Sequence, residues 1–389
     1  MNEYFFDCVR LLFLFYLLFC FHTHYCQTIR VRIYDGINAK ELQCVIGSGN
    51  YLLAANQPDG STKYIALNTL AQGRFKISGS QLQFVQNGNL ILQASQFELI
   101  QQNREDFINW SIPAISTKTR AYEGDFELSL RKGQICLINR IELETYLEGV
   151  VSSEGGNGHQ KAYYQAQAII SRTYALSNAE RHQKDGFALC DRVHCQAYLH
   201  KRSGTALIDS AVFQTSAIVL LDADNQYFPT FFHANCGGQT CAPQEVWNEQ
   251  ITGLHSFKDT FCIHTKQATW VKRIPIATWT SYLVENYGFP LQDSTAYALM
   301  QNFQSTDRCA FYLHPVYGIP MRDLREAFKL KSSYFDAEVI GQEIVLHGRG
   351  FGHGVGLCQE GAMNMAKQGF TYDQILRFYY SGAHLSVSP

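Results

Sequence analysis

The sequence lacks a lysine- and arginine-rich run and has few charged side chains of either sign. Lysine and arginine number 32 and aspartate and glutamate 34, so the formal net charge is -2. Charged residues make up 17% of the chain, against about 25% in typical soluble proteins. A protein that binds a nucleic-acid backbone needs a patch or stripe of positive charge, so we do not expect nucleic acid as a partner.

A long hydrophobic run is also missing. The uncharged stretch of residues 11–21 is too short for a membrane-spanning helix, which needs about 20 residues. Its length fits the hydrophobic region of a signal peptide, so residues 1–26 are predicted to direct export to the periplasm or the cell-wall side of the membrane. Glu3 and Asp7 outnumber Arg10 ahead of the stretch, and no small-residue cleavage site follows it. An uncleaved membrane anchor is therefore the alternative.

The sequence contains no His-Glu-x-x-His motif, no internal repeat and no low-complexity tract. The absence of the motif argues against a zinc peptidase, because two histidines one helical turn apart are the usual ligands in such enzymes. Nine cysteines lie beyond Cys26, which is an odd number. At least one of them is therefore outside any internal disulfide.

The N-terminal third has the pattern of a small β-domain. A length of 389 residues exceeds one minimal core and favours two to three domains. Ile29, Val31 and Ile33 alternate with polar neighbours, as in a half-buried strand, and Asn87-Gly88 is a strong hairpin signal. We predict a β-rich domain over residues 27–113.

The pattern changes after residue 113 to a mixture of strands and helices, which predicts a second domain over residues 114–389. Apolar residues recur every three or four positions over residues 161–182, the longest predicted helix. A partly helical insertion without an obvious motif is predicted near residues 265–340. The expected class is α+β, with antiparallel strands covered by a few helices in addition to the N-terminal β-domain. The other predicted elements are strands at 125–130 and 134–139 and helices at 142–150, 277–287, 321–330, 359–367 and 371–382.

The segment 348–365, with the sequence GRGFGHGVGLCQEGAMNM, places His353 between Gly352 and Gly354. Glycine adopts backbone angles closed to other residues and has no side chain to block a ligand, so these two glycines would leave the imidazole exposed on a sharp turn. Gln359 follows six residues later. The alternative is a tight glycine-rich turn with a structural histidine.

Glu154 lies in Ser152-Ser153-Glu154-Gly155-Gly156, between two predicted helices. A carboxylate on a glycine-flanked loop can face a cleft while its surroundings adjust its acidity, which suits a general acid or base. The alternative is a solvated surface glutamate, which is what most glutamates are.

His182, Cys190, His194 and Cys195 lie within fourteen residues of one another. Two thiolates and two imidazoles can form a tetrahedral zinc site, and the spacing of the cysteines is within the usual range for ligands. A disulfide between Cys190 and Cys195 would stabilise the fold by about 2 kcal/mol through closure of a short loop. Spacing alone leaves both open, although the adjacent histidine has no purpose in a simple crosslink.

Two further groups have more than one interpretation. Arg172 lies among the small residues Ala168 and Ala175 on one face of the long helix, where it could be a buried ion-pair partner or a ligand clamp. Cys236 follows His233 and precedes two glycines. A thiol nucleophile can be imagined there, but proximity in sequence does not establish a thiolate–imidazole pair.

Taken together, these residues resemble the stage II sporulation protein D and LytB amidase-enhancer family of peptidoglycan-acting proteins. The match follows the order of the family's motifs from about residue 124 to residue 382, and such an ordered set is more specific than any single motif. Residues 27–113 contribute little to it. The matching segments are Tyr146–Glu154, Ala166–Ala168, Arg172–Leu176, Leu189–Asp191, His194–Gln196, Phe232–His233, Gly237–Gly238, Trp247, Leu324–Arg325, Leu330–Ser332 and Gly348–Ala362.

The resemblance implies a lytic transglycosylase that cleaves glycan strands of peptidoglycan without water and leaves anhydro-muramic ends. It implies that Glu154 is the single catalytic acid and base, and that some members bind one structural zinc at the cysteine and histidine segment. No organic cofactor is implied. The implied substrate-binding residues are Arg172, Tyr174, His233, His353 and Gln359.

The sequence departs from the family after Glu154, where Gly155-Gly156-Asn157-Gly158-His159 replaces the usual turn with methionine and proline. Cys236 and Cys358 stand where serine is more common. The family's enhancer branch supplies the alternative function, a non-catalytic wall-binding activator of a cell-wall amidase, and the altered turn keeps that alternative open.

Overall fold

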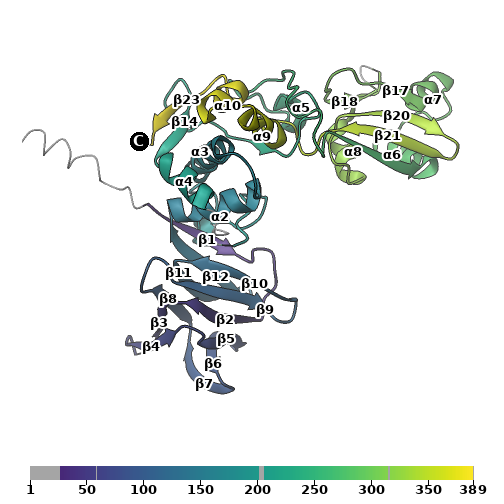
Figure 1. The fold of residues 1–389 in the computed structure, drawn as a ribbon. Coiled ribbons are helices and arrows are strands. Elements are labelled where there is room, and N and C mark those ends of the chain that lie inside the picture. The colour runs from purple at the N-terminus through teal and green to yellow at the C-terminus, as the bar shows by residue number, and fades with distance from the viewer. Residues whose placement is uncertain (1–26, 58, 201–205, 314–315, 389) are drawn as a thin grey trace, which may run out of the picture.

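Two mainly antiparallel sheets form the N-terminal part of the protein in the computed structural model, which describes residues 27–57, 59–200, 206–313 and 316–388 (Figure 1). The predicted signal peptide, residues 1–26, lies outside these ranges. The first sheet has the strand order β13 (Leu189–Cys190), β1 (Thr28–Ile33), β12 (Gln134–Glu142), β11 (Asp125–Arg131), β8 (Gln96–Gln101), β3 (Asn50–Asn56) and β4 (Thr62–Asn68). The second has the order β10 (Ser116–Glu123), β9 (Phe107–Ile112), β2 (Glu41–Ser48), β5 (Gln72–Ser78), β6 (Gln81–Gln86) and β7 (Asn89–Ala94).

Aromatic side chains fill the space between the two sheets. Phe75 and Trp110 of the second sheet contact Phe97 and Phe126 of the first, with ring centroids 5.4 Å apart for Phe75 and Phe97 and 5.3 Å for Trp110 and Phe126. All four side chains are buried. The predicted hairpin at Asn87-Gly88 is confirmed, because both residues have the positive φ that a two-residue hairpin requires.

The β-region extends beyond residue 113, where the sequence predicts a boundary. Strands β9 and β10 pair across that position, and β11 and β12 belong to the first sheet. Because these strands are continuous with the N-terminal sheets, the change from strand to helix comes after Glu142, and α2 begins at Leu143.

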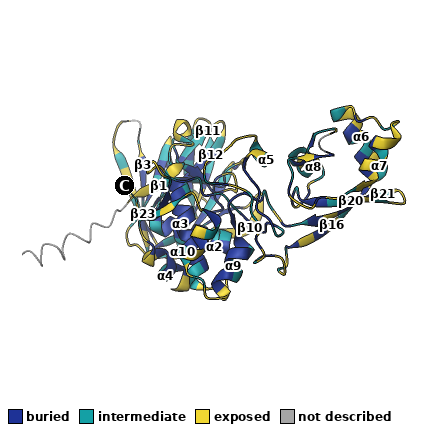
Figure 2. Ribbon diagram, turned by 90° about the horizontal axis from the view of Figure 1, so that it is seen from above, coloured by how far each residue is buried: buried dark blue, intermediate teal, exposed yellow. Residues whose placement is uncertain are grey.

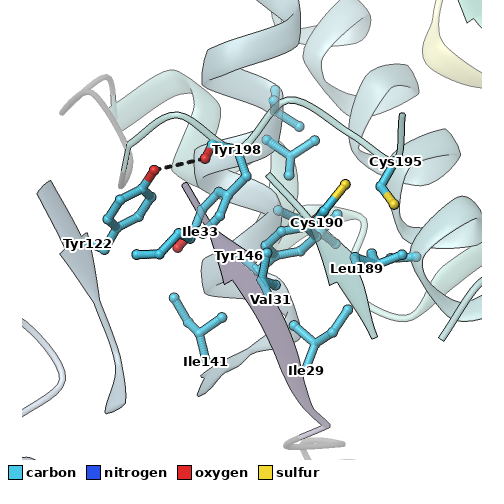
Figure 3. Packing of buried hydrophobic residues seen from close by; sticks show 14 of the residues in the cluster. Ile29, Val31, Ile33, Tyr122, Ile141, Tyr146, Leu189, Cys190, Cys195 and Tyr198 are labelled. Carbon is cyan, nitrogen blue, oxygen red and sulfur yellow. Dashed lines mark hydrogen bonds between the residues drawn. The ribbon is translucent and has the colours of Figure 1, made fainter. Parts of the chain in front are cut away.

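A helical layer covers the end of the first sheet next to β1 (Figure 1). The helix α3 lies at its centre and contacts the helices α2, α4, α9 and α10. The buried residues of α3 include Ala166 and Ile169, in agreement with the predicted stripe. Figure 3 shows the junction, where Ile29, Val31 and Tyr146 pack together. The bounds are α2 (Leu143–Gly155), α3 (Lys161–Ser177), α4 (Ala206–Gln214), α9 (Gln359–Lys367) and α10 (Tyr372–Tyr379), with the 3-10 turn η1 (Gln183–Asp185) after α3.

Two short sheets complete this part of the chain. The antiparallel pair β14 (Ile218–Leu221) and β23 (His384–Val387) packs beside α3. The parallel pair β15 (Phe232–His233) and β22 (Leu357–Cys358) brings two of the family motifs together, and the short helix α5 (Gln244–Trp247) follows β15. The predicted capping box of Thr371 and Gln374 is present at the start of α10.

Residues 269–349 form a module with a hydrophobic core of its own, which includes Trp279, Leu283 and Phe335. The module projects from the rest of the protein in both views (Figures 1 and 2), and Arg308 connects it by hydrogen bonds to the carbonyls of Cys236 and Gln239, each of 2.7 Å. It occupies the place of the predicted insertion. Its elements are β16 (Thr269–Pro275), α6 (Ile276–Tyr287), α7 (Ser294–Gln301), β17 (Asn302–Phe303), β18 (Phe311–Tyr312), β19 (Ile319–Pro320), α8 (Met321–Ala327), β20 (Phe335–Ile340) and β21 (Glu343–Arg349).

The architecture confirms the α+β class predicted from the sequence. Antiparallel pairing dominates both large sheets and the four-stranded sheet β16-β21-β20-β17. Helices contact the first large sheet and the four-stranded sheet. In the described part of the chain, no helix combines the length and apolar character that a membrane span requires.

Candidate functional site

Glu154 lies in the last turn of α2 rather than on the predicted loop. The helix continues to Gly155, and Gly156 ends it with a φ of 65°, a backbone angle that glycine adopts without strain. The prediction that the helix stops at Val150 was therefore wrong. A carboxylate at the C-terminal end of a helix faces the negative end of the helix dipole, which disfavours its charged form.

The surroundings of Glu154 favour its protonated form. Burial raises the pKa of the carboxyl group above its ordinary value, and the hydrogen bond that Oε1 accepts from the backbone N–H of Ala197, of 2.6 Å, opposes that effect only in part. The helix dipole acts in the same direction as burial. An acid with a raised pKa can donate a proton near neutral pH.

Gln359 contacts the same residue from the start of α9. Its Nε2 donates to the backbone carbonyl of Glu154 at 3.2 Å and to Oε1 of Gln167 at 3.4 Å. The ring of Tyr163 lies 3.3 Å from the position that a Cβ on Gly155 would occupy. Gln359, predicted to bind substrate, thus lies next to Glu154. Tyr163 and Gln167 were not predicted as site residues, although they lie four residues apart on one face of α3.

A pocket of 550 Å³ lies beside the loop that follows Glu154. The loop is held by Tyr164, whose hydroxyl donates to the carbonyl of Gly156 at 3.1 Å and accepts from the backbone N–H of His159 at 3.2 Å. The lining combines imidazole, amide, hydroxyl and charged groups, which suits a ligand rich in hydroxyl groups. The residues are Gly158, His159, Gln160, His264, Thr265, Glu360, Met363, Asn364 and Lys367.

His353 packs among aromatic rings rather than standing free on a turn. Its ring centroid lies 5.2 Å from that of Trp247 and 5.5 Å from that of His233. Its Nδ1 accepts a hydrogen bond of 3.0 Å from the backbone N–H of Val355. Burial, reinforced by the positive charges of Arg325 and Arg308, lowers the pKa of His353 to about 4, so the imidazole is neutral at pH 7.

The glycines around His353 allow the close packing. Gly352 and Gly354 have φ angles of 109° and 86°, as the predicted sharp turn requires. Gly356 has a φ of 71°, and a Cβ there would lie 2.0 Å from the carbonyl oxygen of Phe231. Only glycine therefore allows β22 to approach β15.

His233 lies beneath this turn and is buried. Its Nδ1 hydrogen-bonds to the carbonyl of Val355 at 3.1 Å, and in the described part of the chain its Nε2 has no partner. Burial, and then the neighbouring His353, lower the pKa of His233 well below its ordinary value. A neutral His233 holds the segment that contains His353, which is a positioning role.

Within the described residues Glu154 and His353 share no hydrogen bond, and Gln359 rather than His353 contacts Glu154. His353 precedes β22 and Gln359 follows it, and β22 pairs with β15. The structure thus supports Gln359 as the direct neighbour of the carboxyl group and places His353 on the side of Trp247.

Arg172 does not face a ligand, so the prediction of substrate binding is corrected. Its side chain is buried, and Nε and Nη2 donate to the two carboxylate oxygens of Glu144 at 2.8 and 2.6 Å. Nη1 donates to the carbonyl of Ile218 at 2.9 Å. These contacts use the guanidinium to join α2, α3 and β14, which is the ion-pair alternative.

Tyr174 is also directed elsewhere. Its hydroxyl accepts a hydrogen bond of 3.0 Å from Arg181 and lies 3.4 Å from the carbonyl oxygen of His194. Tyr174 therefore lies beside the cysteine and histidine cluster, and its predicted contact with substrate finds no support in these contacts.

The four residues predicted as metal ligands converge. The donor atoms of His182, Cys190, His194 and Cys195 all lie within 4.8 Å of one another. The Sγ of Cys195 lies 3.4 Å from Nε2 of His182 and 3.6 Å from Nδ1 of His194, and the Sγ of Cys190 lies 3.8 Å from the same Nδ1. Neither cysteine is in a disulfide.

This donor set fits a metal that prefers tetrahedral sulfur and nitrogen ligands. Bonds of about 2.3 Å to sulfur and about 2.0 Å to nitrogen place neighbouring donors roughly 3.5 Å apart, close to the observed spacing. The hydrogen bond with the Cys195 thiol lowers the pKa of Cys190, which favours a thiolate at that position. Figure 3 shows Cys190 following Leu189, which pairs with Val31 of β1, so the sheet fixes one ligand.

Comparison with known proteins agrees with the motif order. Residues 131–221 match the family model of SpoIID, the stage II sporulation protein. The stage II sporulation protein D of Bacillus subtilis (strain 168) is 30% identical over 264 residues, which cover 64% of this chain and 76% of that protein. The corresponding protein of Bacillus amyloliquefaciens is 27% identical over 268 residues, which cover 64% and 75%. An amidase enhancer of Bacillus subtilis (strain 168) is 24% identical over 290 residues, which cover 62% of this chain and 40% of that protein. The chain therefore belongs to the stage II sporulation protein D family.

Proposed function

We propose that the protein is a lytic transglycosylase that cleaves the glycan strands of peptidoglycan, with Glu154 as its single acid and base. The observation that carries the proposal is the raised pKa of a partly buried glutamate at a helix C-terminus, just before a loop that lines a polar pocket. Membership of the family supports a role at the cell wall. Action on peptidoglycan requires export, in keeping with the hydrophobic stretch of residues 11–21.

The proposed reaction needs one carboxyl group. Protonated Glu154 donates its proton to the glycosidic oxygen, and the bond from that oxygen to C1 of the muramic acid breaks. The C6 hydroxyl oxygen of the same sugar forms a new bond to C1, and its proton passes to the Glu154 carboxylate. The proton count balances without water, whereas hydrolysis by the usual routes needs a second carboxylate.

Contacts around Glu154 serve these steps. The N–H of Ala197 stabilises the carboxylate formed after the first transfer. Glu360 lines the pocket, but its Oε2 accepts hydrogen bonds from Asn235 and Thr265, which hold it in place. This engagement favours Glu154 as the group that exchanges protons.

An incubation of the purified protein with isolated glycan strands tests the proposal. Mass spectrometry should show products lighter than hydrolysis products by one water, with anhydro-muramic ends. The second candidate is an activator of a cell-wall amidase, which the similarity to an amidase enhancer favours. An activator would accelerate peptide release by added amidase and give no anhydro ends by itself.

We also propose that His182, Cys190, His194 and Cys195 hold one structural zinc ion. When bound, the metal would crosslink these side chains by coordination. Ala197, whose N–H holds Glu154, lies two residues after Cys195. The cluster therefore also positions the partner of the catalytic carboxyl group.

The variant Cys190→Ser should contain one zinc equivalent fewer per chain than the unaltered protein, because three ligands bind zinc much more weakly than four. Inductively coupled plasma mass spectrometry of the purified protein measures the content. Cys309→Ser, which changes a partly buried thiol in the module, should leave the zinc content unchanged. Equal zinc in the Cys190→Ser and unaltered chains would contradict the assignment.

The raised pKa of Glu154 predicts a dependence on pH. Cleavage should decrease as pH rises through the folded-state pKa, since the reaction begins with the protonated acid. Stability follows the same sign, because a raised pKa stabilises the fold at pH values below its ordinary value of 4.5, and this contribution is lost as pH rises through the raised pKa. Thermal denaturation should show that the melting temperature of Glu154→Gln increases relative to that of the unaltered protein as the pH rises. A difference independent of pH would exclude the raised pKa.

A further inference from the structure

A second convergence of cysteines lies at the β15–β22 pair. The donor atoms of Cys236, Asp259, Cys262 and Cys358 lie within 4.8 Å of one another, and all four residues are buried. Three parts of the chain supply them: the turn after β15, the 259–262 turn, and the end of β22. The proposed cleavage reaction uses none of these groups.

The contacts within this cluster are close. The Sγ of Cys236 lies 3.2 Å from the Sγ of Cys262 and 3.2 Å from Oδ2 of Asp259. Cys358 accepts hydrogen bonds at its Sγ from the backbone N–H groups of Cys236 at 3.3 Å and Gly361 at 3.4 Å. These two backbone donors hold the sulfur of Cys358 in place beside the other donor atoms of the cluster.

Asp259 is buried with neutral partners only. Its Oδ2 accepts from the hydroxyl of Tyr379 at 2.9 Å and from the thiol of Cys236, and its Oδ1 accepts from the backbone N–H of Phe261 at 2.9 Å. Among the described residues no cation pairs with this carboxylate. A buried carboxylate is normally paired or coordinates a metal, because desolvation of an unpaired charge is costly.

We propose that Cys236, Cys262, Cys358 and Asp259 form a second metal site that binds zinc. Three thiolates and one carboxylate are a tetrahedral donor set that zinc accepts. Tetrahedral coordination needs sulfur atoms about 3.8 Å apart, so the pair of Cys236 and Cys262 would separate by roughly half an ångström. The Tyr379 hydroxyl would orient the carboxylate.

A disulfide between Cys236 and Cys262 is the competing account. A disulfide would use two of the four donors and would not explain why the donor atoms of Cys358 and Asp259 lie next to them. A metal uses all four, including the carboxylate that lacks a cation. The convergence therefore favours the metal.

The site would crosslink the elements that lead to the catalytic carboxyl group. Cys358 caps α9 and directly precedes Gln359, which contacts Glu154, and Cys236 follows the strand that pairs with β22. Zinc binding at this site does not depend on the proposed cleavage activity, so a failure of either proposal can be distinguished from a failure of the other.

Zinc counting on the full chain, purified with reductant and without chelator, tests the proposal. We expect Cys262→Ser and Cys358→Ser each to contain one zinc equivalent fewer than the unaltered chain. The double variant Cys190→Ser/Cys262→Ser should lose two. Cys44→Ser, which alters another buried cysteine, one that donates to the carbonyl of Gly73, should keep the full content.

Cobalt binding tests the second site without any substitution among its proposed ligands. The Cys190→Ser chain, stripped of zinc and titrated with cobalt, should bind one equivalent tightly and show the thiolate-to-cobalt absorption band. This result holds even if Cys262→Ser fails to fold. Absence of the band in a folded Cys190→Ser chain, or a Cys236–Cys262 crosslinked peptide in a non-reducing digest of the freshly purified protein, would overturn the proposal.

Discussion

Replacement of Glu154 by glutamine is expected to reduce the release of anhydro-muramic ends by a factor of about 100 to 10,000, the range that general acid–base catalysis contributes. Glutamine has the same shape and cannot donate an acidic proton. Its amide oxygen can still accept the hydrogen bond from Ala197, and the bond from Gln359 goes to the backbone carbonyl, so both contacts persist. The fold and the binding of glycan strands should therefore remain. Mass spectrometry of the products, together with a strand pull-down, measures the two effects separately.

The variant Glu285→Gln is the matched control. It makes the same change on the exposed face of α6, in the separate module, and should leave cleavage unchanged. Full activity in Glu154→Gln would reject the assignment of the acid. Loss of strand binding in that variant would instead show that the carboxylate contributes to recognition.

The elements that sequence periodicity predicted well are those with strong local signals. The helix 359–367 has its predicted bounds, because Gly369 and the capping box at Thr371 mark where one helix ends and the next begins. The end of α2 was missed. Ser152 and Ser153 favour caps and turns locally, but Ser152 is buried in the last turns of the helix, so tertiary packing overrides that preference.

The residues of the candidate site could be predicted only in part, because some of them are brought together by tertiary packing alone. His182, Cys190, His194 and Cys195 are close in sequence, so their spacing predicted that they meet. Cys236, Asp259, Cys262 and Cys358 come from three distant segments, and their convergence depends on the pairing of β15 with β22. No local pattern reports such pairing. Asp259 and Cys262 therefore escaped notice.

The exposure of the His353 side chain could not be predicted from its motif alone. The glycines correctly predicted the turn, but the exposure of the imidazole depends on Trp247, His233 and Phe231, which pack against it. Trp247 was identified only as part of the family pattern. In the structure Trp247 contacts His353 and covers one side of its imidazole ring.

Replacement of Arg172 by methionine is expected to destabilise the fold by about 3–5 kcal/mol, the cost of leaving one member of a buried ion pair unpaired. The side chain of Arg172 is 1% exposed and that of Glu144 19%, so solvent can compensate the remaining carboxylate only in part. Urea denaturation followed by circular dichroism measures the loss, and the double variant Arg172→Met/Glu144→Gln should recover part of it.

Arg273→Met provides the comparison for this effect, because Arg273 pairs with Glu343 at a distance of 3.2 Å while both side chains remain about half exposed. Exposed pairs contribute about 0–1 kcal/mol to stability, so this variant should unfold at nearly the same urea concentration as the unaltered protein. If Arg172→Met kept its stability and instead lost affinity for glycan strands, the guanidinium would be a substrate clamp after all. The bidentate contact with Glu144 argues for the opposite result, since it leaves the guanidinium engaged at the junction of α2 and α3.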